Sequence, residues 1–318
     1  MNPFFSIIIP AYNVEKYIAR AIKSVLSQSF QDYEIIIVND GSVDKTSVII
    51  DGYAKENKKI KIINHLKNES LHIVRMDGVA ESNGKYIMFL DSDDYFTKNA
   101  LDILYSKIQI NNNYDFYEFA YIQKPSGKKI FPSFKGEDRF SAYFSVDNCP
   151  PPTMWNKVYD AEFIKKVFSS SLERVYINNI EDTYESIIIS WYTKKVFYIK
   201  EIIINYSIGT GISTTNKNYT KIIDYVVSLN TVLNLVNKFI KDNKLFINIE
   251  YLYIRHLSYV IYFINSQKDN EEKKKLFLVL LDYFDSKIIL KCFLNSKDYI
   301  IGHKITQLLR RIRKLIKI

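Results

Sequence analysis

Short apolar runs alternate with helix-like segments over residues 5–90, and this alternation constrains the fold more than any other feature of the sequence. The apolar runs are Phe5 to Pro10, Tyr33 to Val38, Ile60 to Asn64 and Tyr86 to Leu90. Apolar runs of this length are typical of strands that are buried on both faces of a sheet. The segments with apolar residues at helical spacing are Val14 to Leu26, with Asn13 as its N-cap, Thr46 to Glu56 and His72 to Glu81. The pattern therefore predicts a parallel sheet with helices on both faces, and such sheets bind ligands at the carboxyl ends of their strands.

The later part of the chain changes character twice. A further helix is predicted from Asn99 to about Asn111, followed by less regular segments and a break at Pro150-Pro151-Pro152. Beyond these, the pattern becomes helical, with a polar interruption at Lys268 to Lys275. We therefore predict an α/β domain over residues 1–215 and a helical region over residues 216–318.

Composition narrows the class of protein. A hydrophobic content of 47% with 25% charged residues is ordinary for a soluble globular chain. The net charge of +9 suits a polyanion or an anionic membrane surface, although no motif supports nucleic-acid binding. Cys149 and Cys292 lie far apart and predict neither a disulfide framework nor a zinc site, so a reducing cytoplasm is the expected compartment. We predict no signal peptide in residues 1–10 and no membrane-spanning helix.

Polar clusters follow the second and fourth apolar runs, at Asn39-Asp40-Gly41-Ser42 and Asp91-Ser92-Asp93-Asp94. Alternate residues of an extended segment point the same way, so Asp91 and Asp93 can converge on one ligand. Neighbouring carboxylates raise each other's pKa unless a cation joins them. Oxygen ligands suit Mg²⁺ or Mn²⁺, which usually binds through one or two carboxylates plus substrate phosphates. The alternative is that each cluster is only a turn or a helix N-cap, where Asp, Ser and Gly are also favoured.

Several motifs occur in a fixed order along the first 210 residues. They are Ser6 to Asn13, Glu34 to Thr46, Asn68 with Arg75 and Gly78, Tyr86 to Asp94, Trp155 to Tyr159, and Glu181-Asp182. Together they resemble the large family-two inverting glycosyltransferases. The resemblance implies the glycosyltransferase-A fold, a Rossmann-like and mostly parallel sheet flanked by helices, and it makes Asp91 to Asp93 a diphosphate site rather than a turn.

The same resemblance implies roles for residues on the donor side. The residues that would line the base pocket are Pro10, Ala11, Tyr12 and Asn13. Asp40 would hydrogen-bond the uracil or other base, and Arg75 would lie near the nucleotide and its diphosphate. Asp91 would lie close to the ribose, with Ser92 beside it on the nucleotide-sugar side.

The reacting groups follow in the same way. By the resemblance, Asp93 would ligate the Mn²⁺ or Mg²⁺ that bridges the diphosphate, and Asp182 would be the general base. A metal can neutralise the charge on the leaving nucleoside diphosphate, and a carboxylate can take the proton of the attacking hydroxyl. On the acceptor side we place Glu181 and Trp155, whose ring could stack on a sugar. A buried aromatic is the alternative for Trp155.

Some positions depart from the family's pattern. Asn39 stands where many relatives have Asp, Met76-Asp77 follows Arg75 in place of Asn-x, and His72-Ile-Val precedes it in place of small residues. The Gln-x-x-Arg-Trp of processive synthases is absent from the sequence. The resemblance thus implies addition of one sugar, from a UDP-hexose or UDP-N-acetylhexosamine, to a hydroxyl of a glycan or lipid-linked acceptor in bacterial surface polysaccharide synthesis. A polyprenyl-phosphate sugar transferase and a non-catalytic nucleotide-sugar-binding protein are the alternatives.

A basic amphipathic segment ends the sequence at Lys304 to Ile318. Its apolar residues share one helical face, and lysines and arginines without any acidic residue occupy the rest. This composition predicts a helix on an anionic membrane surface, at the inner face of the cell membrane. The alternative is a terminal helix that packs on protein or on a second subunit.

Overall fold

The computed structural model describes residues 2–134, 136–145, 148–209, 219–266 and 269–289. The chain divides into two compact units. The first unit comprises residues 1–140 and 150–216, and the second comprises residues 141–149 and 217–318. The predicted basic segment Lys304 to Ile318 and Cys292 lie outside the described residues.

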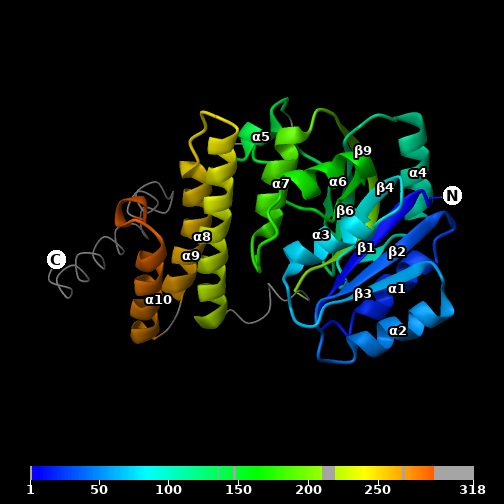
Figure 1. Cartoon of the computed structure of the whole chain (residues 1–318), viewed down its shortest axis with the longest axis horizontal. Helices are drawn as coiled ribbons and strands as arrows, with labels where there is room; N and C mark the ends of the chain where they lie inside the picture. Colours follow the sequence, from blue (N-terminus) through cyan, green and yellow to red (C-terminus); the bar gives the residue numbers. More distant parts are fainter. Residues whose placement is uncertain (1, 135, 146–147, 210–218, 267–268, 290–318) are drawn as a thin grey trace. The chain divides into compact units, whose positions relative to one another are not determined.

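A single sheet runs through the first unit in the order β3-β2-β1-β4-β8-β6-β9-β5, with β7 paired to β6 (Figure 1). Its strands are β1 (Phe5–Ala11), β2 (Tyr33–Asn39), β3 (Ile60–Asn64), β4 (Tyr86–Phe89), β5 (Tyr95–Phe96), β6 (Phe116–Lys124), β7 (Lys129–Ile130), β8 (Lys157–Asp160) and β9 (Val196–Ser207). Strands β1 to β4 are parallel, as predicted. Strand β8 runs antiparallel to β4 and β6, so the whole sheet is mixed. Strands and helices no longer alternate regularly after β4. Parallel neighbours need crossover connections, usually helices, and most of these are therefore missing from the later part of the sheet.

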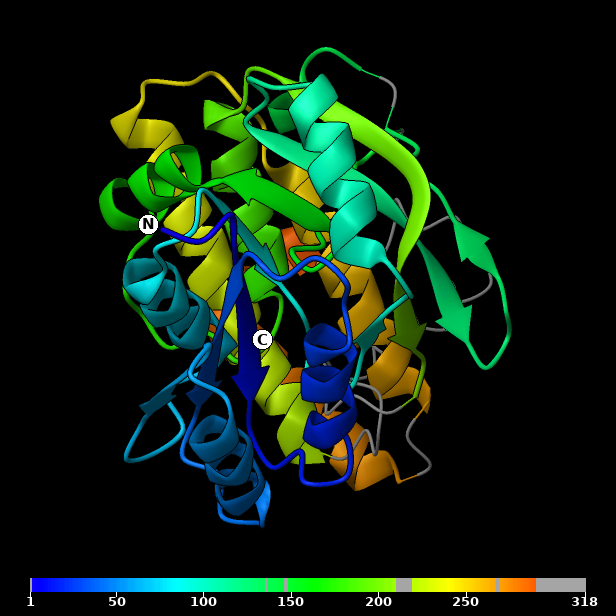
Figure 2. The same ribbon diagram turned by 90° about the vertical axis from the view of Figure 1, so that its right-hand side faces the viewer.

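Helices cover both faces of this sheet because successive strand residues point to opposite sides. The helices of the first unit are α1 (Ile18–Leu26), α2 (Thr46–Glu56), α3 (Leu71–Glu81), α4 (Ala100–Ile110), α6 (Ala161–Ser170) and α7 (Glu181–Tyr192), and the short α5 (Arg139–Ala142) begins in the first unit and ends in the second. Ile7 and Ile9 of β1 join the core formed with α1, α2 and α4, and Figure 2 shows α1 and α4 on one side of the sheet. Ile8 faces the other way, where the close approach of α3 leaves room only for Gly78.

Most predicted boundaries in this unit are confirmed to within two residues, but the start of α1 is not. Asn13 is not the N-cap, because α1 begins at Ile18. Asn13 instead has a left-handed backbone (φ 53°), and its side-chain oxygen accepts a hydrogen bond from the Val43 N–H at 2.9 Å. Asn13 therefore bonds to the loop after β2 and does not cap α1.

The second unit is helical in its described part, with α8 (Tyr219–Asp242), α9 (Glu250–Ser266) and α10 (Asn270–Tyr283) packed on one another. Buried leucines on all three helices supply its core, among them Leu229, Leu252 and Leu280. The predicted polar interruption at 268–275 is confirmed at its start, because α9 ends at Ser266 and α10 begins at Asn270, where Asp269 caps the helix by accepting from the Glu271 N–H at 2.7 Å. The rest of this run forms the first turns of α10.

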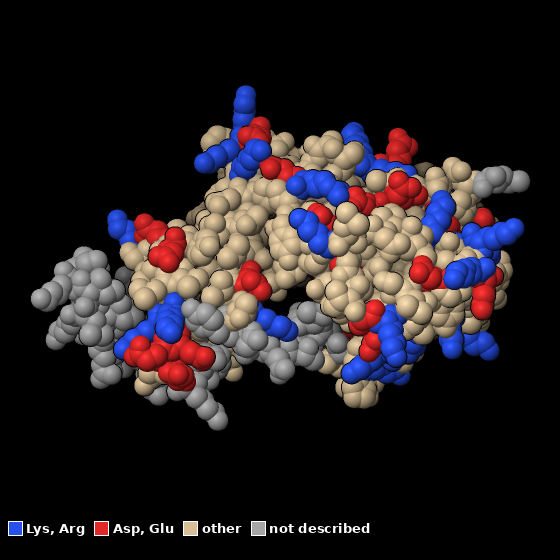
Figure 3. Space-filling model, turned by 60° about the horizontal axis from the view of Figure 1, so that its bottom comes forward, with Lys and Arg blue, Asp and Glu red and all other residues tan. Residues whose placement is uncertain are grey.

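Surface charges are mixed in sign on the face that Figure 3 shows, where lysines and arginines lie among aspartates and glutamates. The described residues therefore form no single basic patch on this face. None of the described helices is both long and apolar enough to cross a membrane.

Candidate active site

The loops that follow β1 and β2 are tied together at the carboxyl edge of the sheet. Ala11, at the end of β1, pairs in register with Asn39, at the end of β2. Beyond this pair, the Asn13 N–H donates to Ser42 Oγ at 3.1 Å, and the Val14 N–H donates to Thr46 Oγ1 at 2.9 Å. The predicted base-pocket segment, Pro10 to Asn13, therefore lies against the loop that carries Asp40.

Gly41 lets this loop approach a third one. Its φ of 68° is left-handed, and a Cβ on it would lie 2.6 Å from the Lys67 carbonyl carbon and 2.9 Å from the Asn68 backbone nitrogen. Only glycine avoids both the strain and the collision. The loops after β1, β2 and β3 consequently form one surface.

Asn39, the departure from the family's pattern, is used as both donor and acceptor. Its Nδ2 donates to Asn64 Oδ1 and to Ser47 Oγ, both at 2.9 Å, and its Oδ1 accepts from the Ser42 N–H at 3.3 Å. An ionised aspartate could not donate, so the amide suits this position.

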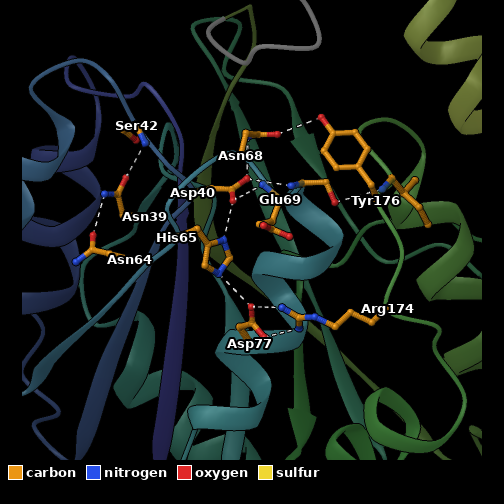
Figure 4. A network of polar contacts seen from close by, with 12 residues as sticks. Asn39, Asp40, Ser42, Asn64, His65, Asn68, Glu69, Asp77, Arg174 and Tyr176 are labelled. Atoms are coloured by element: carbon orange, nitrogen blue, oxygen red, sulfur yellow. Dashed lines mark hydrogen bonds and ion pairs between the residues drawn. The ribbon is translucent and has the colours of Figure 1, made fainter.

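Asp40 is buried and is surrounded by donors (Figure 4). Its carboxylate contacts His65 Nδ1 at 2.7 Å and accepts from Asn68 Nδ2 and the Glu69 N–H, both at 2.8 Å, and from the Ser70 N–H at 3.1 Å. A carboxylate offers about four acceptor positions, and four partners occupy them here. Binding of a base by Asp40 stays a prediction, and a base N–H would compete with these donors.

A cluster of buried charges joins α3 to α7. Arg75 of α3, whose side chain is 1% exposed, donates to Asp182 and to Glu185 Oε2, the latter at 2.8 Å, and it lies 3.8 Å from Glu181 Oε1. Burial opposes the charge on Arg75, but these three acids together raise its pKa. Arg75 is therefore a permanent cation at the start of α7, where Glu181 and Asp182 stand.

His72 extends this cluster by one residue. Its Nδ1 lies 2.8 Å from Glu185 Oε1, and its Nε2 lies 2.9 Å from the Glu173 carbonyl oxygen. Glu185 thus has one oxygen on Arg75 and the other on His72. The sequence did not identify His72 or Glu185 as site residues. His72 stands one helical turn before Arg75, and Glu185 stands one turn after Asp182, a spacing that places each pair on one helix face.

The carboxylates after β4 lie near the same cluster. Burial raises the pKa of Asp91 to about 7, with Arg75 opposing the rise and Asp182 and Asp93 adding to it. Burial also raises the pKa of Asp182, again with Arg75 opposing. The structure therefore brings together Asp91, Asp93, Arg75, Asp182 and Glu181, although Asp40 belongs to a separate network.

Asp94 fixes the turn that carries these groups. Its backbone N–H donates to the Asp91 carbonyl at 2.9 Å, and its Oδ1 accepts from the Ser207 N–H at 2.7 Å. Burial raises the pKa of Asp94 to about 9, helped by Asp91, and its Oδ2 has no hydrogen-bond partner among the described residues. Arg20 closes the turn by donating to the Asp93 carbonyl at 2.5 Å and to Ser207 Oγ at 3.0 Å.

The donor set after β4 suits a divalent cation. Carboxylates with raised pKa values are groups that a nearby cation would hold ionised. Among the described residues, no three His, Cys, Asp or Glu side chains are gathered closely enough to hold a metal by themselves. The residues that could hold Mg²⁺ or Mn²⁺ here are Asp91 and Asp93, since these ions need only one or two carboxylates and complete their shells with water and substrate phosphates.

Trp155 is a buried aromatic, which is the alternative that the sequence left open. Its side chain is 5% exposed and stacks on Tyr206 with ring centroids 4.7 Å apart, while Tyr121 packs edge-on at 4.6 Å. Burial raises the pKa of Tyr206 to about 12, and Asp94 and Asp91 raise it further. Tyr206 is therefore a ring of this stack that lies near the carboxylates.

Comparison with protein families gives one match to this region. The sequence model of the family described as "Glycosyl transferase family 2" matches residues 6–168. The putative glycosyltransferase EpsH of Bacillus subtilis is 28% identical over 214 residues, which cover 65% of this chain and 61% of the relative. The uncharacterized glycosyltransferase EpsJ of the same organism is 36% identical over 131 residues, or 41% of this chain and 38% of the relative. The chain thus spans less than two thirds of these curated relatives.

Solved structures resemble the chain over more of its length. The crystal structure of S. aureus TarS 1-349 in complex with UDP-GlcNAc matches with a TM-score of 0.62 and 16% identity, covering 92% of this chain and 83% of the other. A second structure of the same TarS fragment matches with a TM-score of 0.61 and 17% identity, covering 92% and 81%. At these identities the likeness shows a shared fold.

Proposed function

The chain belongs to glycosyl transferase family 2 and has the glycosyltransferase-A fold, and on this premise we propose that it moves a single sugar from a UDP-sugar to an acceptor hydroxyl with inversion. As a member of this family it is a glycosyltransferase of the bacterial surface-glycan type that uses a nucleotide-sugar donor. The acceptor would be a hydroxyl of a glycan or a lipid-linked saccharide.

The arrangement of Asp182 carries the proposal. Its side chain is 28% exposed, is bonded by Arg75, and lies close enough to Asp91 to raise the pKa of that carboxyl. The raised pKa of Asp182 makes its carboxylate a better proton acceptor than an ordinary aspartate. Asp182 would take the proton of the acceptor hydroxyl as the oxygen attacks the anomeric carbon from the face opposite the nucleotide. The attack forms the new C–O bond while the bond to the diphosphate breaks, so the anomeric configuration inverts.

The donor would bind across the loop ends. Pro10 to Asn13 would contact the base and Asp91 the ribose, with Ser92 and Arg75 nearby. A divalent Mn²⁺ or Mg²⁺ held by Asp93 would neutralise charge on the leaving diphosphate. The fold neighbour TarS was crystallised with UDP-GlcNAc, which supports a UDP-sugar as the donor.

An Asp182→Asn variant tests the proposed base. Loss of the base should lower turnover by about 10²- to 10⁴-fold while UDP binding stays within about two-fold of wild type. Asp160→Asn is the matched control, because Asp160 caps α6 by accepting from the Phe163 N–H at 3.0 Å and asparagine caps equally well. The control should turn over like wild type.

The same experiment separates the alternatives. A phosphate acceptor needs no strong base, so near-normal turnover of Asp182→Asn would favour a polyprenyl-phosphate sugar transferase. A non-catalytic nucleotide-sugar-binding protein would bind UDP-sugar without ever releasing UDP, which prolonged incubation of the wild type would reveal.

A further inference from the structure

An irregular segment precedes α7, the helix that carries Asp182. It is connected at four places to α3 and to the loop that enters α3. This segment, residues 173–177, is called the strap here; it has neither helix nor strand structure and lies four residues before α7. Five bonds make these four connections. They run from His72 Nε2 to the Glu173 carbonyl at 2.9 Å, from Arg174 to Asp77 at 2.5 and 2.9 Å, from Tyr176 Oη to Asn68 Oδ1 at 3.1 Å, and from the Ile177 N–H to Ser70 Oγ at 3.2 Å. These partners stand on α3 or on the loop that enters it, and the strap is also bonded to α7, where the Glu173 N–H donates to Tyr184 Oη at 3.1 Å.

Three of these partners also lead to Asp40 (Figure 4). Asn68 accepts from Tyr176 with its oxygen and donates to Asp40 with its nitrogen. Ser70 accepts from Ile177 with its hydroxyl and donates to Asp40 with its N–H. The strap is therefore separated from Asp40 by a single residue along two routes.

The third route runs through ionisable side chains. His65 lies between two carboxylates, with Nδ1 2.7 Å from Asp40 Oδ1 and Nε2 3.0 Å from Asp77 Oδ2. Arg174 in turn donates a bidentate hydrogen bond to the Asp77 carboxylate. An imidazole can donate from both nitrogens only when it is protonated. Acidic and basic side chains alternate here in the order Asp40, His65, Asp77 and Arg174, so each has neighbours of the opposite kind. Asp77 is also one of the positions that departs from the family's pattern.

We propose that His65, Asp77 and Arg174 are positioning residues that hold the Asp40 loop and the strap as one piece. Through the strap, the donor-side loop then sets the place of Asp182, which lies five residues beyond Ile177. The proposal rests on the proposed function, in which Asp182 is the base. A base displaced by about 1 Å can lose roughly 10²-fold in rate, so a weakened strap should affect kcat before it affects stability.

Arg174→Gln is the sharpest test because Arg174 is 52% exposed and its ion pair contributes little to stability. We expect kcat to fall about 5- to 10-fold, with the Kd of UDP within about two-fold of wild type and the melting temperature nearly unchanged. The matched control is Lys107→Gln, which breaks an ion pair of 2.6 Å between Lys107 and Glu201, 37% and 38% exposed, in the same unit. This control should leave kcat unchanged.

A second variant removes a neutral route to the strap. Tyr176→Phe deletes the hydroxyl that donates to Asn68 and keeps the ring. Because both routes hold the same segment, the double variant Arg174→Gln/Tyr176→Phe should lose more kcat than the product of the two single losses. Arg174→Lys, which keeps the charge but not the bidentate bond, should recover part of the rate.

Amide hydrogen exchange over residues 173–185 provides a readout that is independent of turnover. The double variant should exchange faster there than wild type, and Lys107→Gln should not. If the wild type transferred no sugar but this exchange difference appeared, the proposed function would fail and the positioning proposal would stand. Unchanged exchange, or a kcat equal to that of Lys107→Gln in a working enzyme, would overturn the positioning proposal.

Discussion

Replacing Arg75 by methionine removes the cation that bonds both Asp182 and Glu185 while keeping a side chain of similar length. Glu185 is fully buried, and of its two partners described above it would keep His72, whose Nδ1 lies 2.8 Å from Oε1. Removing one member of a buried ion pair costs about 3–5 kcal/mol, because the remaining charge stays out of water without compensation. For a unit of this size, that loss corresponds to a fall of roughly 6–20 °C in melting temperature.

Restoring neutrality should recover much of this loss. In the double variant Arg75→Met/Glu185→Gln no carboxylate is left buried at position 185, so the double variant should be more stable than Arg75→Met alone. Turnover should stay low in both, since Asp182 has lost its partner. Thermal unfolding followed by circular dichroism gives the stabilities, and release of UDP from UDP-GlcNAc gives the rates.

Arg139→Met is the control for Arg75→Met. Arg139 is also buried and donates to the buried Glu118 at 2.7 Å, so its loss should destabilise the unit comparably. Its turnover, measured well below the melting temperature, should stay close to wild type. A loss of stability below about 1 kcal/mol in Arg75→Met, or equal turnover in the two variants, would refute the reasoning.

Three further predictions follow from the described residues. Gly41→Ala should weaken UDP binding at least about 10-fold by calorimetry, since its Cβ would lie 2.6 Å from Lys67 backbone atoms, and unaltered binding would contradict the close packing of the two loops. Chelation of divalent cations should abolish turnover and the UDP-induced rise in melting temperature, and Asp93→Asn should lack that metal-dependent rise; a rise that survives chelation would exclude the metal assignment. Burial lowers the pKa of His256 from 6.5 to about 4, so the unfolded chain binds the proton first as pH falls. Stability of the second unit should therefore be complete above pH 6.5 and decline by up to ~3 kcal/mol toward pH 4, and urea unfolding of His256→Gln, whose amide can still accept from Tyr225, should show a shallower decline.

Local signals in the sequence predicted the half of the sheet formed by β1 to β4. The bounds of α2 and β3 agree with the prediction, because apolar spacing and buried position are both set within a few residues there. The antiparallel pairing of β8 with β4 was not predicted, since it joins Tyr86 to Asp160 across a long stretch of chain.

The candidate site was predictable in part for the same reason. Strand ends marked Asp40, Asp91 and Asp93 in the sequence, but the partners of a buried charge lie on other elements. Nothing near Arg75 in the sequence shows that Glu185 would meet it. Likewise, the four partners that occupy Asp40 come from a loop some 25 to 30 residues further along.

The bond between Arg75 and Glu185 joins residues 110 positions apart and so has a consequence for the order of folding. Strands β1 to β4 can pair with one another while the chain is still being synthesised, because their mutual pairing lies within its first ninety residues. Arg75 must remain hydrated through that stage, and it loses its water only when α7 docks. Contacts of such long separation form late in folding. The charge cluster can therefore form only after α7 has been synthesised, and a chain truncated before residue 181 would lack the three acidic partners of Arg75 that α7 supplies.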